Sequence, residues 1–395
     1  MKRMIALTLA MILLLSGCAA APGESSGDMY DGGLMSGSAS SDWKGMPEGN
    51  GNAAEDIFPG TLTAGEWKDA ENLDFWYELL RDNEWYELMN QRHLFVNRFI
   101  RVSVNDGSGA PCFNVPLQLL DSDLKVLYEA RTDIAGVALL PADLGKDGIE
   151  PTWIGAAGEY YSIENDAAQI TLDHSAVDGQ LDLMLMVDTT GSMRDELQYL
   201  QKELEDVISR VSGSAESLSI RVSVNFYRDE GDEYVVRSFD FTEDIAKAVG
   251  QLNVQTTAGG GDYPEAVHKA LDDIVHGHQW RNDAVKLCFF VLDAPPHKDQ
   301  EIQGINADMT KTVSDAAKQG IRIIPVASSG VDTETEFLLR SWALMTGGTY
   351  TFLTNHSGIG NDHLEPTIGE YKVEKLNECL IRIICEYCGL TYDQQ

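Results

Sequence analysis

The sequence predicts an α/β protein in which a doubly wound, mostly parallel sheet follows a small antiparallel β-sandwich. The apolar run over residues 183–187 needs cover on both faces, as a central parallel strand has. A helical pattern that includes Leu197, Leu200 and Leu204 begins soon after it. Apolar runs and helical patterns then alternate as far as residue 353, which is the order that a doubly wound sheet requires.

Residues 1–18 have the pattern of a lipoprotein signal peptide. Lys2 and Arg3 precede an apolar stretch over residues 5–15, which is too short to be a membrane-spanning helix. The following Leu-Ser-Gly-Cys resembles the bacterial lipobox, which implies that Cys18 becomes the lipid-modified first residue of the mature chain. We therefore expect a protein of the bacterial cell envelope that faces outside the cytoplasm and meets the membrane through its lipid only.

Two segments separate the signal peptide from the first domain. Residues 19–65 are rich in Gly, Ser, Asn and acidic residues, so they cannot bury a core and are expected to form a disordered tether. Residues 66–98 carry Trp67, Trp76 and Trp85, and we expect one or two short helices that pack on the next domain. An aromatic ligand platform is the alternative role for these tryptophans.

Residues 99–175 are predicted to form the β-sandwich. Short alternating runs, such as residues 100–104 and 115–119, are separated by turn signals. The order of these runs, with the turn over residues 132–136, resembles carboxypeptidase-regulatory-like or transthyretin-like modules. This resemblance implies a spacer or a supporting surface for a partner, and the segment contains no catalytic constellation.

Residues 180–355 are predicted to form the parallel sheet and its helices. The expected strands cover residues 183–188, 218–227, 234–241, 285–292, 321–327 and 349–353, and the later helices residues 264–276, 308–319 and 334–346. Pro325 cannot donate a ladder hydrogen bond, so its strand is expected to bend or to lie towards an edge. Residues 356–395 are predicted to be a helical extension, with a helix over residues 371–386 that packs back on the domain.

Oxygen-bearing side chains follow the first strand of this region. Asp188, Thr190 and Ser192 occupy alternate positions where the strand ends, and open α/β sheets bind ligands beyond the carboxyl ends of their strands. One carboxylate and two hydroxyls suit Mg²⁺, Mn²⁺ or Ca²⁺ rather than zinc or copper. The alternative is that Ser192 only caps the following helix, with Asp195 three residues later.

The pattern Asp-x-Thr-x-Ser after a buried strand resembles the metal-ion-dependent adhesion site of von Willebrand factor type A domains. The resemblance extends over residues 180–353 and implies a Rossmann-like sheet in which two later loops supply further metal ligands. Asp293, which directly follows the apolar run over residues 285–292, is implied to be one of them.

The other implied ligand lies in the glycine loop that follows Thr256. The commonest family pattern has a threonine here, whereas in this sequence Asp262 stands just before the predicted helix. We expect Asp262 to be the ligand, directly or through water, because three glycines bring the backbone close to the ion. Thr257 is the alternative ligand, and Asp262 could instead be a helix N-cap with Glu265 three residues later.

The resemblance implies recognition rather than turnover. A divalent cation that the protein coordinates only in part keeps a position for an exposed Asp or Glu of a protein partner, as in adhesion or complex assembly. A purely structural metal in an envelope protein and a metal-dependent hydrolase are the alternatives. No Asp-x-Asp motif begins at Asp188, and no Gly-x-Ser-x-Gly elbow or Gly-Lys-Ser/Thr phosphate loop follows a predicted strand, so no enzyme is predicted.

The charge of the chain excludes one class of partner. The 29 basic and 63 acidic residues give a formal net charge of −34, which disfavours binding to nucleic acid.

Cysteines and histidines provide two weaker patterns. Cys385 and Cys388 could form a redox pair or half a zinc site, but no second pair supports this, and plain packing or an incidental disulfide is the preferred interpretation. His297, His356 and His363 lie near predicted loop ends and form the alternative zinc-site hypothesis.

Overall fold

The computed structural model describes residues 57–144, 148–173, 179–214 and 218–392. The predicted signal peptide, Cys18 and nearly all of the predicted tether lie outside these ranges. Within them, no helix combines the length and the apolar character that crossing a bilayer requires.

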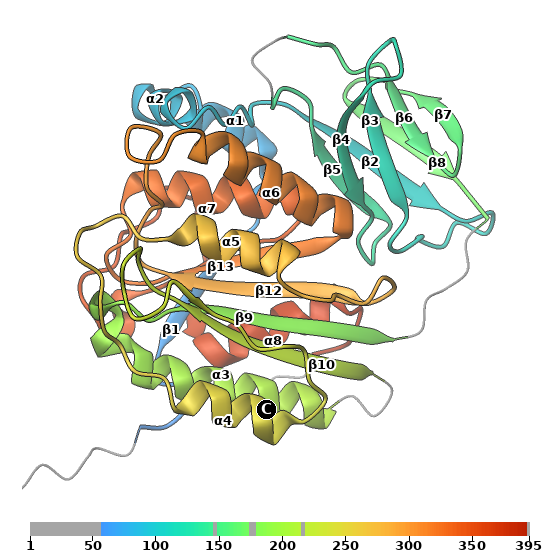
Figure 1. The fold of residues 1–395 in the computed structure, drawn as a ribbon. Helices are drawn as coiled ribbons and strands as arrows, with labels where there is room; N and C mark the ends of the chain where they lie inside the picture. Colours follow the sequence, from blue (N-terminus) through green and yellow to red (C-terminus); the bar gives the residue numbers. More distant parts are fainter. Residues whose placement is uncertain (1–56, 145–147, 174–178, 215–217, 393–395) are drawn as a thin grey trace, which may run out of the picture. The chain divides into compact units, whose positions relative to one another are not determined.

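An eight-stranded sheet, in the order β11-β10-β9-β12-β13-β14-β1-β15, forms the centre of the fold (Figure 1). The parallel strands are β10 (Ser219–Tyr227), β9 (Gln180–Asp188), β12 (Val285–Leu292), β13 (Ile321–Ala327) and β14 (Tyr350–Leu353). The antiparallel strands at its two ends are β11 (Val236–Arg237), β1 (Thr63–Trp67) and β15 (Glu374–Lys375). The sheet is therefore mostly parallel, as predicted.

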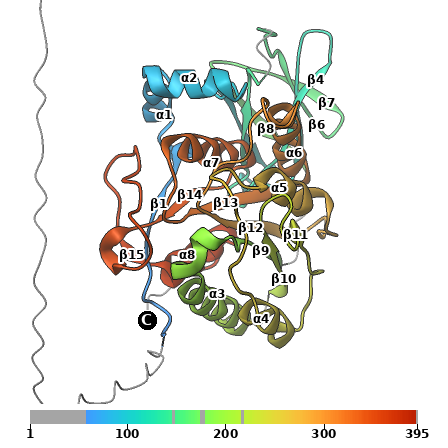
Figure 2. The ribbon, with the colours of Figure 1, turned by 60° about the vertical axis from the view of Figure 1, so that its left-hand side comes forward.

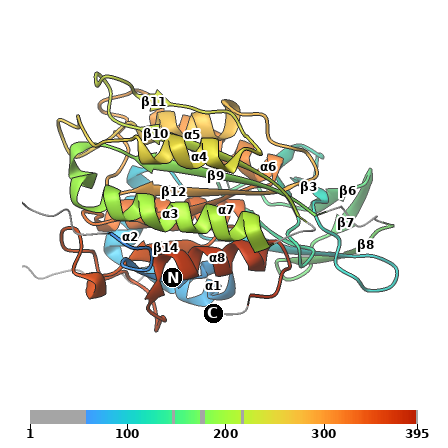
Figure 3. The same cartoon turned by 90° about the horizontal axis from the view of Figure 1, so that it is seen from below.

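Helices cover both faces of this sheet. On one face lie α3 (Arg194–Ser214), α4 (Ile245–Asn253) and α8 (Leu376–Tyr387), which Figure 3 shows in front, and on the other lie α5 (Val267–His276), α6 (Ile305–Gln319) and α7 (Thr333–Thr346). Side chains of a strand alternate between faces, so Leu183 and Val187 pack with the first set of helices and Met184 and Met186 with the second. The prediction of a doubly wound sheet is confirmed.

Two smaller sheets, β5-β2-β8 and β4-β3-β6-β7, form the β-sandwich. Their strands are β2 (Phe99–Asn105), β3 (Pro116–Leu120), β4 (Val126–Arg131), β5 (Val137–Pro141), β6 (Trp153–Ala156), β7 (Glu159–Ser162) and β8 (Ala167–Thr171). The pairs are antiparallel except β2 with β8, which run parallel. The expectation of a purely antiparallel sandwich is thus wrong in one pair, because side-chain alternation reports the buried face of a strand and not its direction.

Part of the chain before the sandwich belongs to the central sheet, which corrects the predicted end of the tether. The predicted tether ends too late, because Thr63–Trp67 is β1 and lies between β14 and β15. The backbone N–H groups of residues 60–62 donate to the buried carboxylate of Glu203 on α3, at 2.7, 2.8 and 2.9 Å. Gly65 interrupts the sequence pattern that would have predicted this strand. A glycine is required here because a Cβ would lie 2.5 Å from the ring of Phe352.

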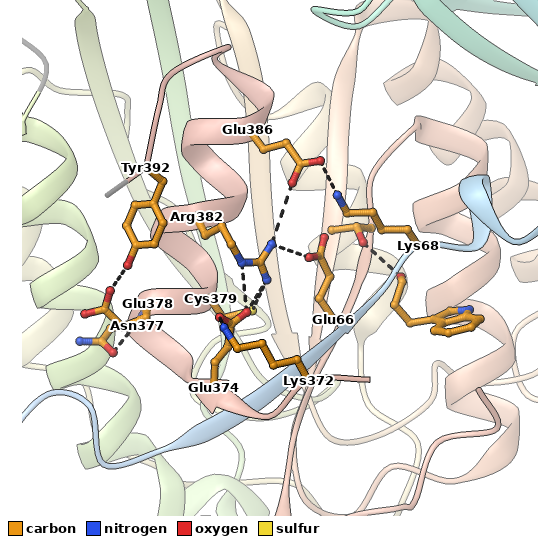
Figure 4. A network of polar contacts seen from close by, with 12 residues as sticks. Glu66, Lys68, Lys372, Glu374, Asn377, Glu378, Cys379, Arg382, Glu386 and Tyr392 are labelled. Carbon is orange, nitrogen blue, oxygen red and sulfur yellow. Dashed lines mark hydrogen bonds and ion pairs between the residues drawn. The ribbon is translucent and has the colours of Figure 1, made fainter. Parts of the chain in front are cut away.

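Salt bridges also fasten β1 to α8 (Figure 4). The guanidinium of Arg382 on α8 donates to Glu66 of β1 at 2.7 Å and also to Glu374 of β15. Lys68, just after β1, pairs with Glu386 near the end of α8. Residues of β15 and α8, which follow the parallel strands in the sequence, therefore hold β1, which precedes those strands.

The short helices α1 (Leu73–Leu79) and α2 (Asn83–Gln91) lie over α7 (Figure 2). α1 also contacts the sandwich, where the N–H of Phe99 on β2 donates to the hydroxyl of Tyr77 at 3.2 Å. Trp76 stacks on Phe337 of α7 with ring centroids 6.4 Å apart, and Trp85 meets the same ring edge-on at 5.9 Å. Both tryptophans are buried, so they are core residues and not an exposed platform.

Smaller corrections concern element boundaries. α5 begins at Val267 with Ala266 as its N-cap, three residues later than predicted. The helix predicted from residue 371 begins at Leu376, because the two residues before it pair with β1. β13 is an interior strand despite Pro325, and its pairing with β14 begins only at the next residue, Val326.

Candidate functional site

The first predicted loop brings its three oxygen-bearing side chains together at the carboxyl end of β9. Asp188 is fully buried, and its Oδ1 accepts hydrogen bonds from the backbone N–H and the hydroxyl of Thr190, both at 2.7 Å. The hydroxyls of Thr190 and Ser192 lie 3.0 Å apart. Asp188 Oδ2 is buried and has no hydrogen-bond partner in the described part of the chain.

Asp293 directly follows β12, the strand that pairs with β9, so the structure places it beside this loop. Burial, then repulsion from the charge of Asp188, raises the pKa of Asp293 to about 8. Burial also raises the pKa of Asp188 to about 6, against the lowering effect of the two hydrogen bonds from Thr190. Asp293 Oδ1, like Asp188 Oδ2, lacks a hydrogen-bond partner among the described residues.

The glycine loop lies directly against the first loop. The N–H of Gly191 donates to Gly259 O and the N–H of Ala258 donates to Thr189 O, both at 3.1 Å. Gly260 has a φ of +69°, and a Cβ there would lie 2.9 Å from the carboxylate of Glu265 and 3.3 Å from Thr190. A side chain at this position would therefore push the two loops apart.

A hollow of about 400 Å³ lies between these loops. Its lining residues include Gly191, Ser192, Gly259, Gly260, Gly261, Asp262, Tyr263, Glu265, Asp293, Ala294, Ser329, Gly330 and Asn361. Asp262 is exposed at its rim and is not an N-cap, since the helix begins later. Thr257 is half-buried and is not among the lining residues.

Glu265 is a site residue that the sequence reasoning missed. It is buried, and burial together with the charges of Asp188 and Asp229 raises its pKa to about 10. Its backbone N–H donates to Pro295 O at 3.0 Å, and its Oε2 has no hydrogen-bond partner within the described ranges. The preceding Pro264 supported a helix start here. Instead, the chain pairs with the loop between β12 and α6, residues 293–304 (the third loop), before it enters α5.

Asp229 and His297 form a second pair that the sequence did not reveal. Asp229 lies just after β10, and its Oδ1 is 3.0 Å from His297 Nε2. Burial lowers the pKa of His297, but the hydrogen bonds to Asp229 and Glu301 outweigh it and leave the pKa raised. The third loop is thereby linked to the ends of both β12 and β10.

The remaining histidines and the cysteines do not join this site. His363 lies beside Glu196 and Asn355, and His356 contacts Thr354. Cys112, Cys288, Cys379, Cys385 and Cys388 are all free thiols. In residues 57–392, gaps excepted, no three His, Cys, Asp or Glu side chains form a ready metal cage, so the histidine zinc site is not formed.

The donor set at the strand ends nevertheless fits a hard divalent cation. It comprises the carboxylates of Asp188 and Asp293 and the hydroxyls of Thr190 and Ser192, and both carboxylates have a buried oxygen without a hydrogen-bond partner in the described structure. Mg²⁺ prefers such oxygen ligands and usually keeps several waters. A cation here would supply the positive charge that makes ionisation of these carboxyls favourable.

Comparison with known proteins gives three kinds of match. Residues 182–358 match the family model described as the von Willebrand factor type A domain. An ariadne-like RING finger protein of Acanthamoeba polyphaga mimivirus is 25% identical over 199 residues, which are 46% of this chain and 19% of the viral protein. The chain thus spans less than a fifth of that relative's length.

Two solved structures match at low similarity, each with a TM-score of 0.37 and over 53% of this chain. One is the conserved hypothetical protein BatB of Bacteroides thetaiotaomicron, with 11% identity and 99% of its chain covered. The other is proximal thread matrix protein 1 of the mussel byssus, with 14% identity and 46% covered. On the family match, residues 182–358 of this chain are a von Willebrand factor type A domain.

Proposed function

We propose that this von Willebrand factor type A domain binds a divalent cation, Mg²⁺ or else Mn²⁺ or Ca²⁺, and through it a carboxylate of a protein partner. The observation that carries the proposal is the set of buried carboxyl oxygens without hydrogen-bond partners at the ends of β9 and β12, belonging to Asp188 and Asp293. A bound cation would compensate their burial, and its remaining coordination positions would face the hollow.

Four side chains would hold the ion in this proposal. Asp188, Thr190, Ser192 and Asp293 supply oxygens from two loops, and Asp262 would act from the rim through water. When bound, the cation attracts a carboxylate, and the protein orients that group between the two loops. The two hydroxyls are neutral, so they add nothing to the negative charge of the two carboxylates, and the ion keeps more attraction for a partner's carboxylate than it would with carboxylates in their place.

The proposed setting is the surface of a bacterial membrane. Lipid on Cys18 would hold the chain there, and the partner would be met in adhesion or complex assembly. The chain is strongly acidic, so anionic membrane lipids and nucleic acid repel it. In this proposal the lipid on Cys18 is therefore the membrane contact, and the partner is a protein.

Loss of the Asp188 carboxylate should abolish binding of the cation and, with it, binding of the partner. Asp188→Ala is expected to abolish Mg²⁺ binding in calorimetry and EDTA-reversible capture of a partner from the parent cell envelope. The domain should stay folded, because the substitution also removes a buried group whose ionised form is costly without the ion. Undiminished Mg²⁺ affinity in Asp188→Ala would exclude the assignment, and capture that EDTA does not reverse would favour a purely structural metal.

Variants of the glycine loop test whether Asp262 or Thr257 contributes to cation binding. Asp262→Asn is expected to weaken Mg²⁺ binding about tenfold, as loss of an outer ligand commonly does. Thr257→Ala should leave the affinity within about twofold, because its side chain does not line the hollow. The reverse order of effects in calorimetry would show that the threonine is the ligand.

The pH dependence of stability should reveal the buried carboxyls. Asp188, Asp293 and Glu265 have folded-state pKa values raised to about 6, 8 and 10, so without metal the native state holds more protons than the unfolded state above about pH 4. Their stabilising contribution is fully present below that pH and is lost as the pH rises, by up to about 1.4 kcal/mol per unit for each extra proton.

This loss can be measured by urea unfolding in EDTA between pH 5 and pH 9. Asp293→Asn should make the decline in the free energy of unfolding shallower, and so should saturating Mg²⁺ on the wild type. The same slope in Asp293→Asn and the wild type would mean that Asp293 is ionised in the metal-free protein.

The proposed anchor has its own test. Cys18→Ala should leave the chain unprocessed or soluble, and it should no longer partition into the detergent phase of a Triton X-114 extract. Partitioning that is unchanged by the substitution would contradict the lipid anchor.

A further inference from the structure

A buried arginine from outside the matched domain holds the loop that carries Asp293. Arg92 follows α2, and its side chain is 2% exposed. Its hydrogen bonds run to Glu334 Oε1 at 2.8 Å, His297 O at 2.9 Å, Pro296 O at 3.0 Å and Asn306 Oδ1 at 3.3 Å. Two of these four acceptors are backbone carbonyls of consecutive residues in the third loop.

The same loop contacts the proposed cation site on its other side. Asp293 begins the loop, Pro295 O accepts the N–H of Glu265 at 3.0 Å, and His297 Nε2 lies 3.0 Å from Asp229. A displacement of the loop backbone therefore moves Asp293 relative to Asp188 and also disturbs Glu265. Arg92 and the residues around the proposed cation site therefore contact the same short segment, residues 295–297.

The composition of the loop explains why an arginine is needed. Pro295 and Pro296 have no backbone N–H, so these residues can be held only through their carbonyl groups. A guanidinium offers several donors in a rigid planar fork and can serve two adjacent carbonyls together with a carboxylate. A lysine would offer one flexible donor group in place of this fixed geometry.

We propose that Arg92 is a positioning residue for the cation site, so that the segment over residues 83–98 and the von Willebrand factor type A domain form one binding unit. The inference rests on the proposed function. Because coupling between two binding events is reciprocal, a cation bound by Asp293 should also strengthen the docking of this segment.

The test compares two buried arginines in the full chain. Arg92→Met removes the donors to the third loop. Arg340→Met is the matched control, because Arg340 on α7 is fully buried and also holds the segment before the sandwich, through Asp69. Its other hydrogen bonds within the described residues run to Glu336 and Thr367 O, and none reaches the third loop. We expect Arg92→Met to weaken Mg²⁺ binding at least tenfold, Arg340→Met to leave it within twofold, and Arg92→Lys to lie between the wild type and Arg92→Met.

A second measurement needs no cation. In EDTA, hydrogen exchange at the Glu265 amide, which donates to Pro295 O, should be faster in Arg92→Met than in Arg340→Met. Equal exchange in the two variants, or unchanged Mg²⁺ affinity in Arg92→Met, would overturn the inference. A wild type that binds no Mg²⁺ would overturn the proposed function instead, and the exchange rates would still decide whether Arg92 braces the loop. If Arg92→Met does not fold, Arg92→Lys supplies both comparisons.

Discussion

Two carboxyl groups buried side by side at the ends of neighbouring parallel strands set the conditions for the rest of this structure. Burial opposes ionisation of both Asp188 and Asp293, and the charge of Asp188 further opposes that of Asp293. The nearby arginines direct their donors elsewhere, since Arg228 donates to Thr256 O and Arg92 to Pro296 O and His297 O. The counter-charge in the proposed function is the cation, and the hollow between the loops would give it room.

That room depends on contacts among three loops and not on one motif. The glycine loop rests on the first loop through two backbone hydrogen bonds, and the third loop is joined to it through the N–H of Glu265. Arg92 then holds the third loop from the outside. The glycine loop lacks side chains at its three glycines, and the third loop lacks the backbone N–H groups of Pro295 and Pro296, so the positions of these two loops depend on their neighbours.

Apart from Asp293, which the family resemblance implied, the parts of the site that the sequence predicts are those whose geometry is local. Asp188, Thr190 and Ser192 follow one strand at alternate positions, so a single stretch of chain brings them together. Glu265 could not be recognised in this way, because its role depends on Pro295 and on two carboxyls from other strands. A helical start and a loop that pairs with another loop look alike when proline precedes glutamate.

The parallel sheet was predictable for a similar reason, and β1 was not. A central strand such as β9 has a continuous apolar run over residues 183–187 and can be recognised without knowledge of its partners. β1 has only five residues, with Gly65 in the middle, and its pairing partners lie almost 300 residues later. Its place is fixed by contacts of β1 with Phe352 and Arg382, and of the residues just before it with Glu203, that no short window of sequence displays.

The position of β1 in the sheet also determines which residues a fragment of this domain must include. β14 pairs with β13 on one side and with β1 on the other. A fragment confined to residues 182–358 would lack β1, so the backbone N–H and C=O groups along one side of Tyr350–Leu353 would be left open. An unpaired, apolar strand at the edge of a sheet is a template for association with other chains. A soluble recombinant domain should therefore begin before Gly60 and extend through α8, even though the family match is much shorter.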